Sequence, residues 1–361
     1  MLNNNKGIAL LITLTIITVL VAVSFELYRQ IRGSVSKAGV SRDLVTAENM
    51  IVSGVNIAEK ILVRDKEETE IDSVQEDWAD PEVLNDYLQQ TGFKAENLSL
   101  EITDELSRLQ INALVQYPDG QKFQPAQQKL WMRFFDLLLA GREQSAREVF
   151  SEPLEPAMII NPVKDWLDSG DNDAVSGLSG AESDYYQDKH PSYACRNGPF
   201  RGISELLRVR NISLDLFERM EQGGNPGDFI TVHGMVPAAD SRHDFFYPGK
   251  ININTAPMPV IAALLPAGQE FLASEITAYR EERAGGQFLH DLAAPNWYKN
   301  VPGMADVDLD SDLITTQSDL FRIECIVKKN GVQMAATVLV TRQKAEKTGK
   351  WQCRVLNWKY R

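Results

Sequence analysis

The sequence predicts an α+β protein with one long N-terminal transmembrane helix, an antiparallel sheet, and a large helical insertion between the strands of that sheet. Three observations lead to this prediction. The segment Ile8–Phe25 contains no charged residue, Gly or Pro. Apolar and polar residues alternate, as in strands, near 98–115, 228–254 and 320–358. The stretches between them are mostly helical in pattern, so helices interrupt the sheet along the chain.

The first apolar segment is long enough to cross the roughly 30 Å hydrocarbon core of a bilayer as a helix. A buried core helix would normally have a polar face, which residues 8–25 lack. A secretory signal peptide would need a small-x-small cleavage site after the apolar segment, and residues 26–30 (Glu-Leu-Tyr-Arg-Gln) contain none. We therefore expect residues 8–28 to stay on the mature chain and span the membrane.

A short polar leader precedes this segment and ends in Lys6-Gly7. Cleavage between Gly7 and Ile8 would remove residues 1–7 and leave the apolar helix in place. The lone Lys6 before the span, with acidic residues after it, favours a cytoplasmic leader and an exported globular part.

The helix is predicted to continue beyond the membrane to about Val63. Apolar residues recur there at spacings of three, four and seven: Leu44, Ile51, Val55, Ala58 and Leu62. We expect residues 8–63 to form one helix whose second half packs against the globular part. The acidic segment 65–80 is expected to be a solvated linker.

The remaining elements are predicted from periodicity and turn residues. Expected helices cover 81–91, 130–140 and 271–283, and a hairpin is expected from a strand at 98–104 and its partner at 108–114. Three C-terminal strands are expected over 321–328, 332–341 and 351–358, with Asn330-Gly331 in the first turn.

Composition restricts the partners of the globular part. The chain has 50 acidic against 37 basic residues and a net charge of −13, which disfavours nucleic acids and anionic lipid surfaces and suits cations. It has three cysteines and no CxxC pair, so the sequence holds no local zinc motif. Cys325 and Cys353 are expected on strands of one sheet, either as a disulfide or as two buried thiols.

Six carboxylates lie close together in sequence among glycines: Asp165, Asp168, Asp171, Asp173, Glu182 and Asp184. Hard cations take six to eight oxygen ligands, often from such loops. A solvated acidic loop is the alternative, but Trp166, Tyr185 and Tyr186 lie among the acids and argue against it. We therefore predict a metal site, with the following ligands: Asp168, Asp171, Asp173, Glu182 and Asp184.

Two other functions find less support in the residues. Residues 251–292 read much like a DNA-binding helix-hairpin-helix module, but Pro266–Glu270 stands where such modules have a Gly-hydrophobic-Gly hairpin that approaches a phosphate. The four histidines are scattered and form no HExxH motif, and no nucleophile elbow is present, so we do not expect an enzyme.

Several motifs resemble those of one family. Residues 163–173 (VKDWLDSGDND), 179–186 (SGAESDYY) and 200–209 (FRGISELLRV) resemble the pattern "DWxDxD…GAEDxYY…SELR" of the K-type minor pseudopilin of type II secretion systems. Residues 102–112 (ITDELSRLQIN) resemble its "ITDxxGRxNLN", with Ser107 in place of Gly. The junction at Gly7 is similar to the class III leader of type IV pilins and pseudopilins.

One departure from most pilins and pseudopilins fits the same family. Most members have Glu at the fifth mature position, where this chain has Ile12, and the K type is the member that lacks this Glu. An unpaired carboxylate in lipid costs several kcal/mol. A subunit placed first at a filament tip has no subunit beyond it to pair with that charge, so Ile costs it nothing.

The resemblance implies a pilin-like fold with an inserted helical domain of the SAM or helix-hairpin-helix kind. It implies these bounds: leader 1–7, N-terminal helix 8–63, first sheet part 97–118, inserted domain with a calcium loop 119–224, sheet segment 225–258, helix-hairpin-helix-like segment 259–305, and C-terminal strands 312–361.

The resemblance also implies a function. The expected protein is a structural subunit at the tip of the pseudopilus, single-pass in the inner membrane of a Gram-negative bacterium, with its C-terminal part in the periplasm. Its expected partners are the I-, J- and H-type minor pseudopilins, with prepilin peptidase cleaving the leader before methylation, and with a secreted substrate or the secretin as further contacts. Calcium is the expected cation, and no nucleic acid is expected. A minor pilin that initiates a type IV pilus is the alternative.

Overall fold

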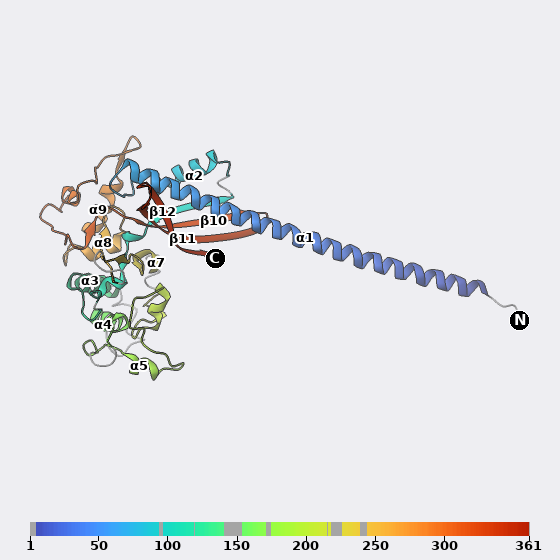
Figure 1. The fold of residues 1–361 in the computed structure, drawn as a ribbon, viewed down its shortest axis with the longest axis horizontal. Coiled ribbons are helices and arrows are strands. Elements are labelled where there is room, and N and C mark those ends of the chain that lie inside the picture. The colour runs from blue at the N-terminus through green and yellow to red at the C-terminus, as the bar shows by residue number, and fades with distance from the viewer. Residues whose placement is uncertain are drawn as a thin grey trace.

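The computed structural model describes residues 5–93, 97–118, 120–140, 154–170, 175–214, 216–217, 226–238 and 244–360. Its first element, α1 (Asn5–Glu68), is one continuous helix of 64 residues. Figure 1 shows the N-terminal half of α1 projecting away from the globular part, while the C-terminal half lies along the sheet. The predicted helix is confirmed, and it runs five residues beyond its predicted end at Val63.

The projecting half of α1 has the features of a membrane span. Among the described residues, α1 is the helix that is long and apolar enough to cross a membrane, and its most apolar stretch is fully exposed. The hydroxyls of Thr13, Thr15 and Thr18 donate to backbone carbonyls three or four residues earlier, at 2.8–2.9 Å. The helix therefore satisfies these polar groups internally, as a span in lipid requires.

The C-terminal half of α1 packs on a four-stranded antiparallel sheet in the order β1-β10-β11-β12. The strands are β1 (Leu98–Asp104), β10 (Leu320–Lys329), β11 (Val332–Lys344) and β12 (Trp351–Tyr360). Ile51, Val55 and Leu62 of α1 are buried with Ile323 and Val338 of the sheet. Gly54 permits this close packing, because a Cβ there would lie 2.9 Å from Cys325 Sγ.

The chain leaves this sheet after β1 and returns at β10, and nearly everything between them forms a second body with its own core (Figure 1). Its helices are α3 (Pro125–Ala140), α4 (Pro156–Leu167), α5 (Ser183–Gln187), α7 (Pro226–Phe229), α8 (Met258–Leu264) and α9 (Leu272–Glu281). The short helices are η2 (Glu105–Ser107), η3 (Ile111–Leu114), η4 (Ile203–Arg208) and η5 (Trp297–Asn300). The buried apolar residues of this body run from Leu109 to Leu313 in one cluster, so the predicted segments between them share a core.

Two strand predictions were wrong. The expected hairpin partner at 108–114 forms η2, the two-residue β2 (Leu109–Gln110) and η3, while β1 pairs with β10 instead. The reason is local, since Asp104 accepts from the amide of Leu106 at 2.8 Å and from the Ser107 hydroxyl at 2.7 Å. These hydrogen bonds form the turn of η2 directly after β1, so the chain leaves the sheet there and no hairpin forms.

The segment 225–258 was expected to extend the sheet and does not. It forms β3 (Ile230–Thr231), β4 (Val236–Pro237), β5 (Phe245–Phe246) and β6 (Ile251–Asn252), which pair outside the four-stranded sheet. β3 pairs with β2, and β6 pairs with β9 (Ile314–Thr315), both in parallel. Gly234 and Gly249 have φ of +103° and +65°, and Pro237 and Pro248 lack an amide proton, so no long ladder forms. The antiparallel pair of β7 (Arg283–Ala284) and β8 (Gln287–Phe288) is equally short.

The segment 65–80, expected to be a solvated linker, is buried in part, while Glu67, Glu68 and Glu70 are exposed. It runs from the end of α1 through η1 (Asp77–Ala79) to α2 (Pro81–Gln90), and Asp72, Ser73 and Trp78 are almost fully buried. Asp72 accepts from the guanidinium of the buried Arg342 on β11. Asp65 and Asp72 are therefore held by a positive charge that comes from the far end of the chain.

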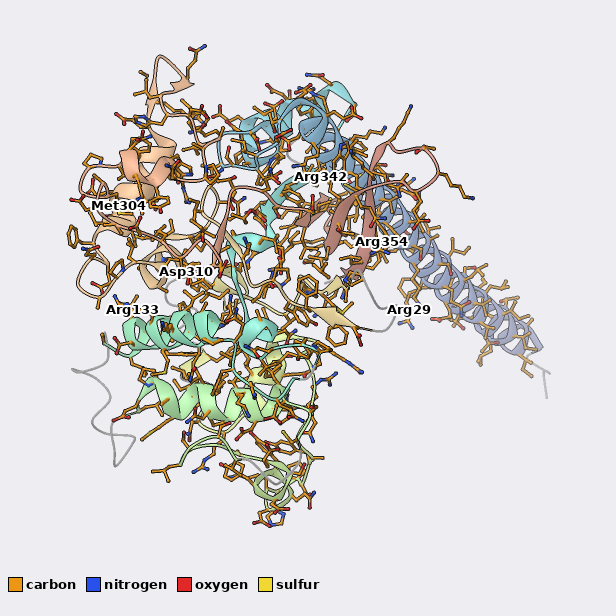
Figure 2. All side chains as sticks on the ribbon, turned by 60° about the vertical axis from the view of Figure 1, so that its left-hand side comes forward. Arg29, Arg133, Met304, Asp310, Arg342 and Arg354 are labelled. Atoms are coloured by element: carbon orange, nitrogen blue, oxygen red, sulfur yellow. The ribbon has the colours of Figure 1, made fainter. Side chains whose placement is uncertain are left out.

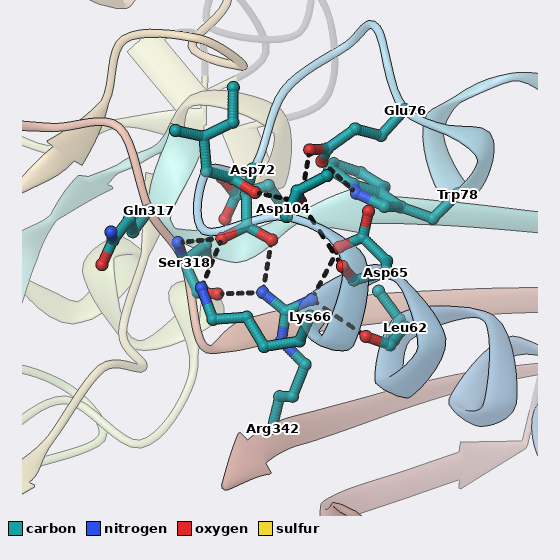
Figure 3. Close-up of polar contacts among 12 residues, drawn as sticks. Leu62, Asp65, Lys66, Asp72, Glu76, Trp78, Asp104, Gln317, Ser318 and Arg342 are labelled. Carbon is teal, nitrogen blue, oxygen red and sulfur yellow. Dashed lines mark hydrogen bonds and ion pairs between the residues drawn. The ribbon is translucent and has the colours of Figure 1, made fainter. Parts of the chain in front are cut away.

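Arg342 is the centre of a buried polar network (Figure 3). Its guanidinium donates to the Leu62 carbonyl at 3.0 Å, to Asp65 at 2.9 Å and to the Ser318 carbonyl at 2.8 Å. Asp72 in turn accepts from the Ser318 amide at 2.8 Å.

The same network reaches the inserted body through Asn252 of β6. The Asn252 amide donates to the Asp72 carbonyl at 2.9 Å and to Asp104 of β1 at 2.8 Å. Burial raises the pKa of Asp104 to about 6. The network thus joins α1, the sheet and the inserted body at one place.

The structure also decides the state of the cysteines, which are all free. Cys325 lies on β10 and Cys353 on β12, with β11 between them. Neighbouring strands are about 4.8 Å apart, so these two strands are about 10 Å apart, whereas a disulfide needs Cα atoms within about 7 Å. Burial raises the pKa of both thiols to about 12.

The Arg342 network predicts a dependence of stability on pH. Burial, reinforced by Glu76 and Asp72 and opposed by Arg342, raises the pKa of Asp65 from 3.8 to about 7. The folded chain therefore binds this proton more tightly than the unfolded chain, and the resulting stability is lost as the pH rises through about 7. We expect the melting temperature of the detergent-solubilised chain to fall from about pH 5 to about pH 8.

Asp65→Asn should make that fall shallower, because Asn cannot ionise. Asp86→Asn, at an exposed position on α2, is the matched control and should leave the fall unchanged. Equal slopes for Asp65→Asn and the unaltered chain would contradict the assignment.

Candidate metal centre

The candidate centre begins with the C-terminal end of α4. Ile159, Ile160 and Val163 bury one side of this helix in the core of the inserted body. Lys164 and Asp165 are buried as well, since both lie on the last turn of the helix beside the buried Trp166. Asp168 is the C-cap residue, and its amide bonds back to the Lys164 carbonyl at 2.8 Å.

Asp165 organises the loop that returns to α5. Its carboxylate accepts from the amides of Ser176 at 3.1 Å and Ala181 at 2.8 Å. Gly180 is required for this approach, because a Cβ there would lie 2.2 Å from Asp165 Oδ2. The buried Glu182 follows directly and is the N-cap residue of α5.

Asp165, Asp168 and Glu182 therefore meet, with one carboxylate oxygen from each within 4.8 Å of the others, and all three are buried. Lys164 is the positive charge seen beside them: its ammonium bonds Asp168 and lies 3.8 Å from Asp165. Burial raises the pKa of Asp168 against the opposing effect of Lys164. Three buried carboxylates whose oxygens lie this close together form an all-oxygen donor set, and such a set fits a hard divalent cation.

Aromatic rings hold this centre against the rest of the inserted body. Trp166 contacts Tyr186 edge-on with ring centroids 5.1 Å apart and stacks on Phe200 at 6.2 Å. The amide and carbonyl of Phe200 are bound by the Asn112 side chain at 2.8 and 3.1 Å. The carboxylates are therefore connected to η4 and to the turn after β1.

The five predicted ligands have different positions. Asp168 and Glu182 lie in the cluster, Asp184 is exposed on α5, and Asp171 and Asp173 lie outside the described residues. Asp165 was noted in the acidic run but was not among the predicted ligands, although it is the residue that joins the two halves of the cluster. One sequence signal could have identified Asp165 as a ligand: it lies three residues before Asp168 on an apolar helix, so both side chains are on the same face.

A second group of close carboxylates is different in kind. Asp65, Asp72 and Glu76 also bring their oxygens within 4.8 Å of one another. The Arg342 guanidinium lies among them and donates to two of the three. The protein thus supplies its own cation there, and this group is part of the structural network.

The other sequence candidates also have defined surroundings. In the helix-hairpin-helix-like segment, the link between α8 and α9 is bound to α3, because Arg133 donates to the carbonyls of Leu265 and Pro266 and pairs with Glu270. Figure 2 shows Arg133 on the side of the inserted body facing Met304 and Asp310. His290 stacks on Tyr279 with ring centroids 3.5 Å apart and bonds Glu282 at 2.7 Å. The contacts of Arg133, Glu270 and His290 are therefore packing contacts within the protein.

Comparisons with known proteins agree on one family. A family model described as type II secretion system (T2SS), protein K, matches residues 107–222, which include the whole candidate centre. The type II secretion system protein K of Pseudomonas aeruginosa is 24% identical over 273 residues, covering 73% of this chain and 69% of the relative. That of Klebsiella pneumoniae is 22% identical over 222 residues, covering 60% and 61%.

The fold agrees as well. A chain in the crystal structure of the GspK-GspI-GspJ complex from the type 2 secretion system of enterotoxigenic Escherichia coli superposes with a TM-score of 0.58. The match covers 90% of this chain and 99% of that chain, at 15% identity. It confirms the pilin-like α+β class: a long apolar helix lies on an antiparallel sheet that is interrupted by a helical body. The fold and the relatives' sequences agree on what this chain is similar to: it resembles protein K of type II secretion systems, whose family model matches residues 107–222.

Proposed function

We propose that this chain is a structural minor pseudopilin at the tip of the type II secretion pseudopilus, where it supports the export of folded proteins. The observation that carries the proposal is the position of the inserted body, which lies at the end of the molecule opposite the N-terminus of α1 (Figure 1). Filament subunits related by a repeated step stack their globular parts along the filament axis. A large body at the distal end obstructs such stacking unless its subunit is the last one.

The apolar half of α1 supports the same proposal. Its side chains are exposed throughout residues 8–25 and need either lipid or the helices of neighbouring subunits. Ile12 is one of them, and it places no carboxylate in the apolar environment. The solved relative comes from a complex of GspK, GspI and GspJ, which makes the I- and J-type minor pseudopilins the first partners to test, followed by the H type.

The remaining assignments follow from this role. The chain is anchored by α1 in the inner membrane with its C-terminal part in the periplasm, where a secreted substrate or the secretin makes further contacts. A minor pilin that initiates a type IV pilus remains the second candidate. Nucleic acid is disfavoured, because the link between α8 and α9 carries Glu270 and its carbonyls are bound by Arg133.

The proposal predicts a defined loss of function. Deleting this chain in its host should abolish export of type II substrates, and tagged full-length chain should co-purify with the I- and J-type subunits in detergent. Loss of surface type IV pili with export intact would instead establish the second candidate. Intact export together with intact pili would exclude both.

Processing is proposed between Gly7 and Ile8, because the peptidase must meet the polar–apolar junction at the cytoplasmic face. Gly7→Leu should leave full-length precursor in the membrane, detected by its mass. Gly33→Leu, at another open position of the same helix, is the matched control and should be cleaved normally. A mature N-terminus after Phe25 would contradict the proposal.

Calcium is proposed as the cation at Asp165, Asp168 and Glu182. The bound ion would offset the negative charge of these carboxylates and hold the loop between α4 and α5 closed. A ligand that binds only the folded state stabilises it by about 2.7 kcal/mol at a hundredfold excess over Kd. We expect chelator to lower the melting temperature by several degrees and Ca²⁺ to restore it. Mg²⁺ should restore it less, since it demands stricter octahedral geometry.

Glu182→Gln should remove most of this difference while keeping the size of the side chain. Asp188→Asn, at an exposed position just after α5, is the control and should keep the full response to chelator. Asp184→Asn tests the exposed residue that the sequence had suggested as a ligand. A melting temperature indifferent to chelator, with no metal in the purified chain, would contradict the calcium proposal.

A further inference from the structure

A groove of about 640 Å³ lies between the sheet and the inserted body, on the face of the sheet that α1 does not cover. One wall is formed by Leu339 of β11 and by Arg354 and Leu356 of β12. Val338 and Val340 flank Leu339 and are buried with α1, so Leu339 points to the opposite face. The other wall comes from the loops around Arg201 and Lys250.

The groove combines apolar with polar lining residues, and part of its apolar surface is open to solvent. Phe200 and Val232 are buried below it, whereas Met235 is 56% and Leu356 46% exposed. Leu356 reaches the groove through a β-bulge. The register pairs Leu339 with Asn357 and Val340 with Val355, so in the described strands Leu356 faces no residue of β11. Bulges of this kind redirect a side chain, and here the redirected side chain is a leucine placed in an open groove.

The charge of the groove is opposite to that of the chain. Among the residues that the structure describes, its lining has three basic side chains, Arg201, Lys250 and Arg354, against one acidic side chain, Asp319. The whole chain has a net charge of −13. Arg201 and Arg354 have no ion-pair partner among the residues that the structure describes, and Figure 2 shows Arg354 on the C-terminal strands. Burial lowers the pKa of His233, which also lines the groove, so at neutral pH it adds no charge.

We propose that this groove binds an extended segment of a partner protein in which acidic and apolar side chains alternate. Carboxylates of such a segment pair with Arg201 and Arg354 at the rim, and its apolar side chains cover Met235 and Leu356. The exposed amides of Gln317 and Asn357 are available to its backbone. Nucleic acid fits poorly, since phosphate backbones are usually held by about six or more basic contacts.

The test uses full-length chain in detergent micelles and a fluorescein-labelled peptide that alternates Glu with Val and Phe. Anisotropy should show saturable binding that weakens at high salt, while a peptide with Lys in place of Glu should not bind. Arg201→Glu with Arg354→Glu should weaken binding at least tenfold. Lys347→Glu with Lys350→Glu, an equal charge change at exposed sites outside the groove, should change it less than twofold. All variants are measured in identical micelles, so any partition of the peptide into detergent affects every variant equally and does not change their comparison.

A second variant tests the apolar part. Leu356→Asp should also weaken binding, and the melting temperature of each variant shows that the fold is kept. The inference is overturned if the Glu and Lys peptides bind equally, if the Arg201/Arg354 variant binds like the Lys347/Lys350 variant, or if no saturable binding occurs. Co-purification with the I- and J-type subunits, measured on the same variants, tests the proposed function separately, because that function does not require this groove.

Discussion

The fold depends on a single buried guanidinium. Arg342 is 1% exposed, yet it bonds the end of α1, the loop that follows α1 and the loop that enters β10. Removing one partner of a buried ion pair typically costs about 3–5 kcal/mol, because the other charge is left uncompensated. Loss of Arg342 would therefore destabilise the contact between α1, the sheet and the inserted body. The orientation of the globular part on α1 is therefore set by electrostatics as much as by the apolar contact of helix and sheet.

The two carboxylate clusters illustrate one rule with different outcomes. Close, buried carboxylates must be neutralised by protons, by basic side chains or by a bound cation. At Asp65, Asp72 and Glu76 the protein uses Arg342 and a raised pKa. At Asp165, Asp168 and Glu182 the Lys164 ammonium bonds Asp168, and Gly180 allows the loop to approach Asp165. The first cluster is therefore neutralised within the fold, and the second is the one for which a bound cation is proposed.

The two faces of the four-stranded sheet also differ in their chemistry. The face of the sheet under α1 is closed by apolar packing, while the opposite face is left with exposed Leu356 and basic residues at its rim. The two faces of the sheet therefore differ in kind: α1 closes one of them, and the other keeps an open groove.

Sequence alone determined the elements whose signals are local. The membrane segment follows from an uninterrupted apolar stretch, α1 and α3 from helical periodicity, and the C-terminal strands from alternation and from Asn330-Gly331. The acidic run with embedded aromatic residues located the candidate centre, because both features lie within one short segment. The family resemblance rested on the same contiguous motifs.

Only the tertiary structure decided what depends on residues distant in sequence. Segment 65–80 looks solvated by its composition, and Arg342, 270 residues beyond Asp72, is what allows Asp65 and Asp72 within it to be buried. The pairing of β1 with β10 and the separation of Cys325 from Cys353 by β11 likewise depend on strand order, which no local pattern contains. Asp165 is buried because its partners, the amides of Ser176 and Ala181, are brought to it by a turn at Gly180. Burial of charge is a property of the assembled neighbourhood, so it is decided when the distant partners meet.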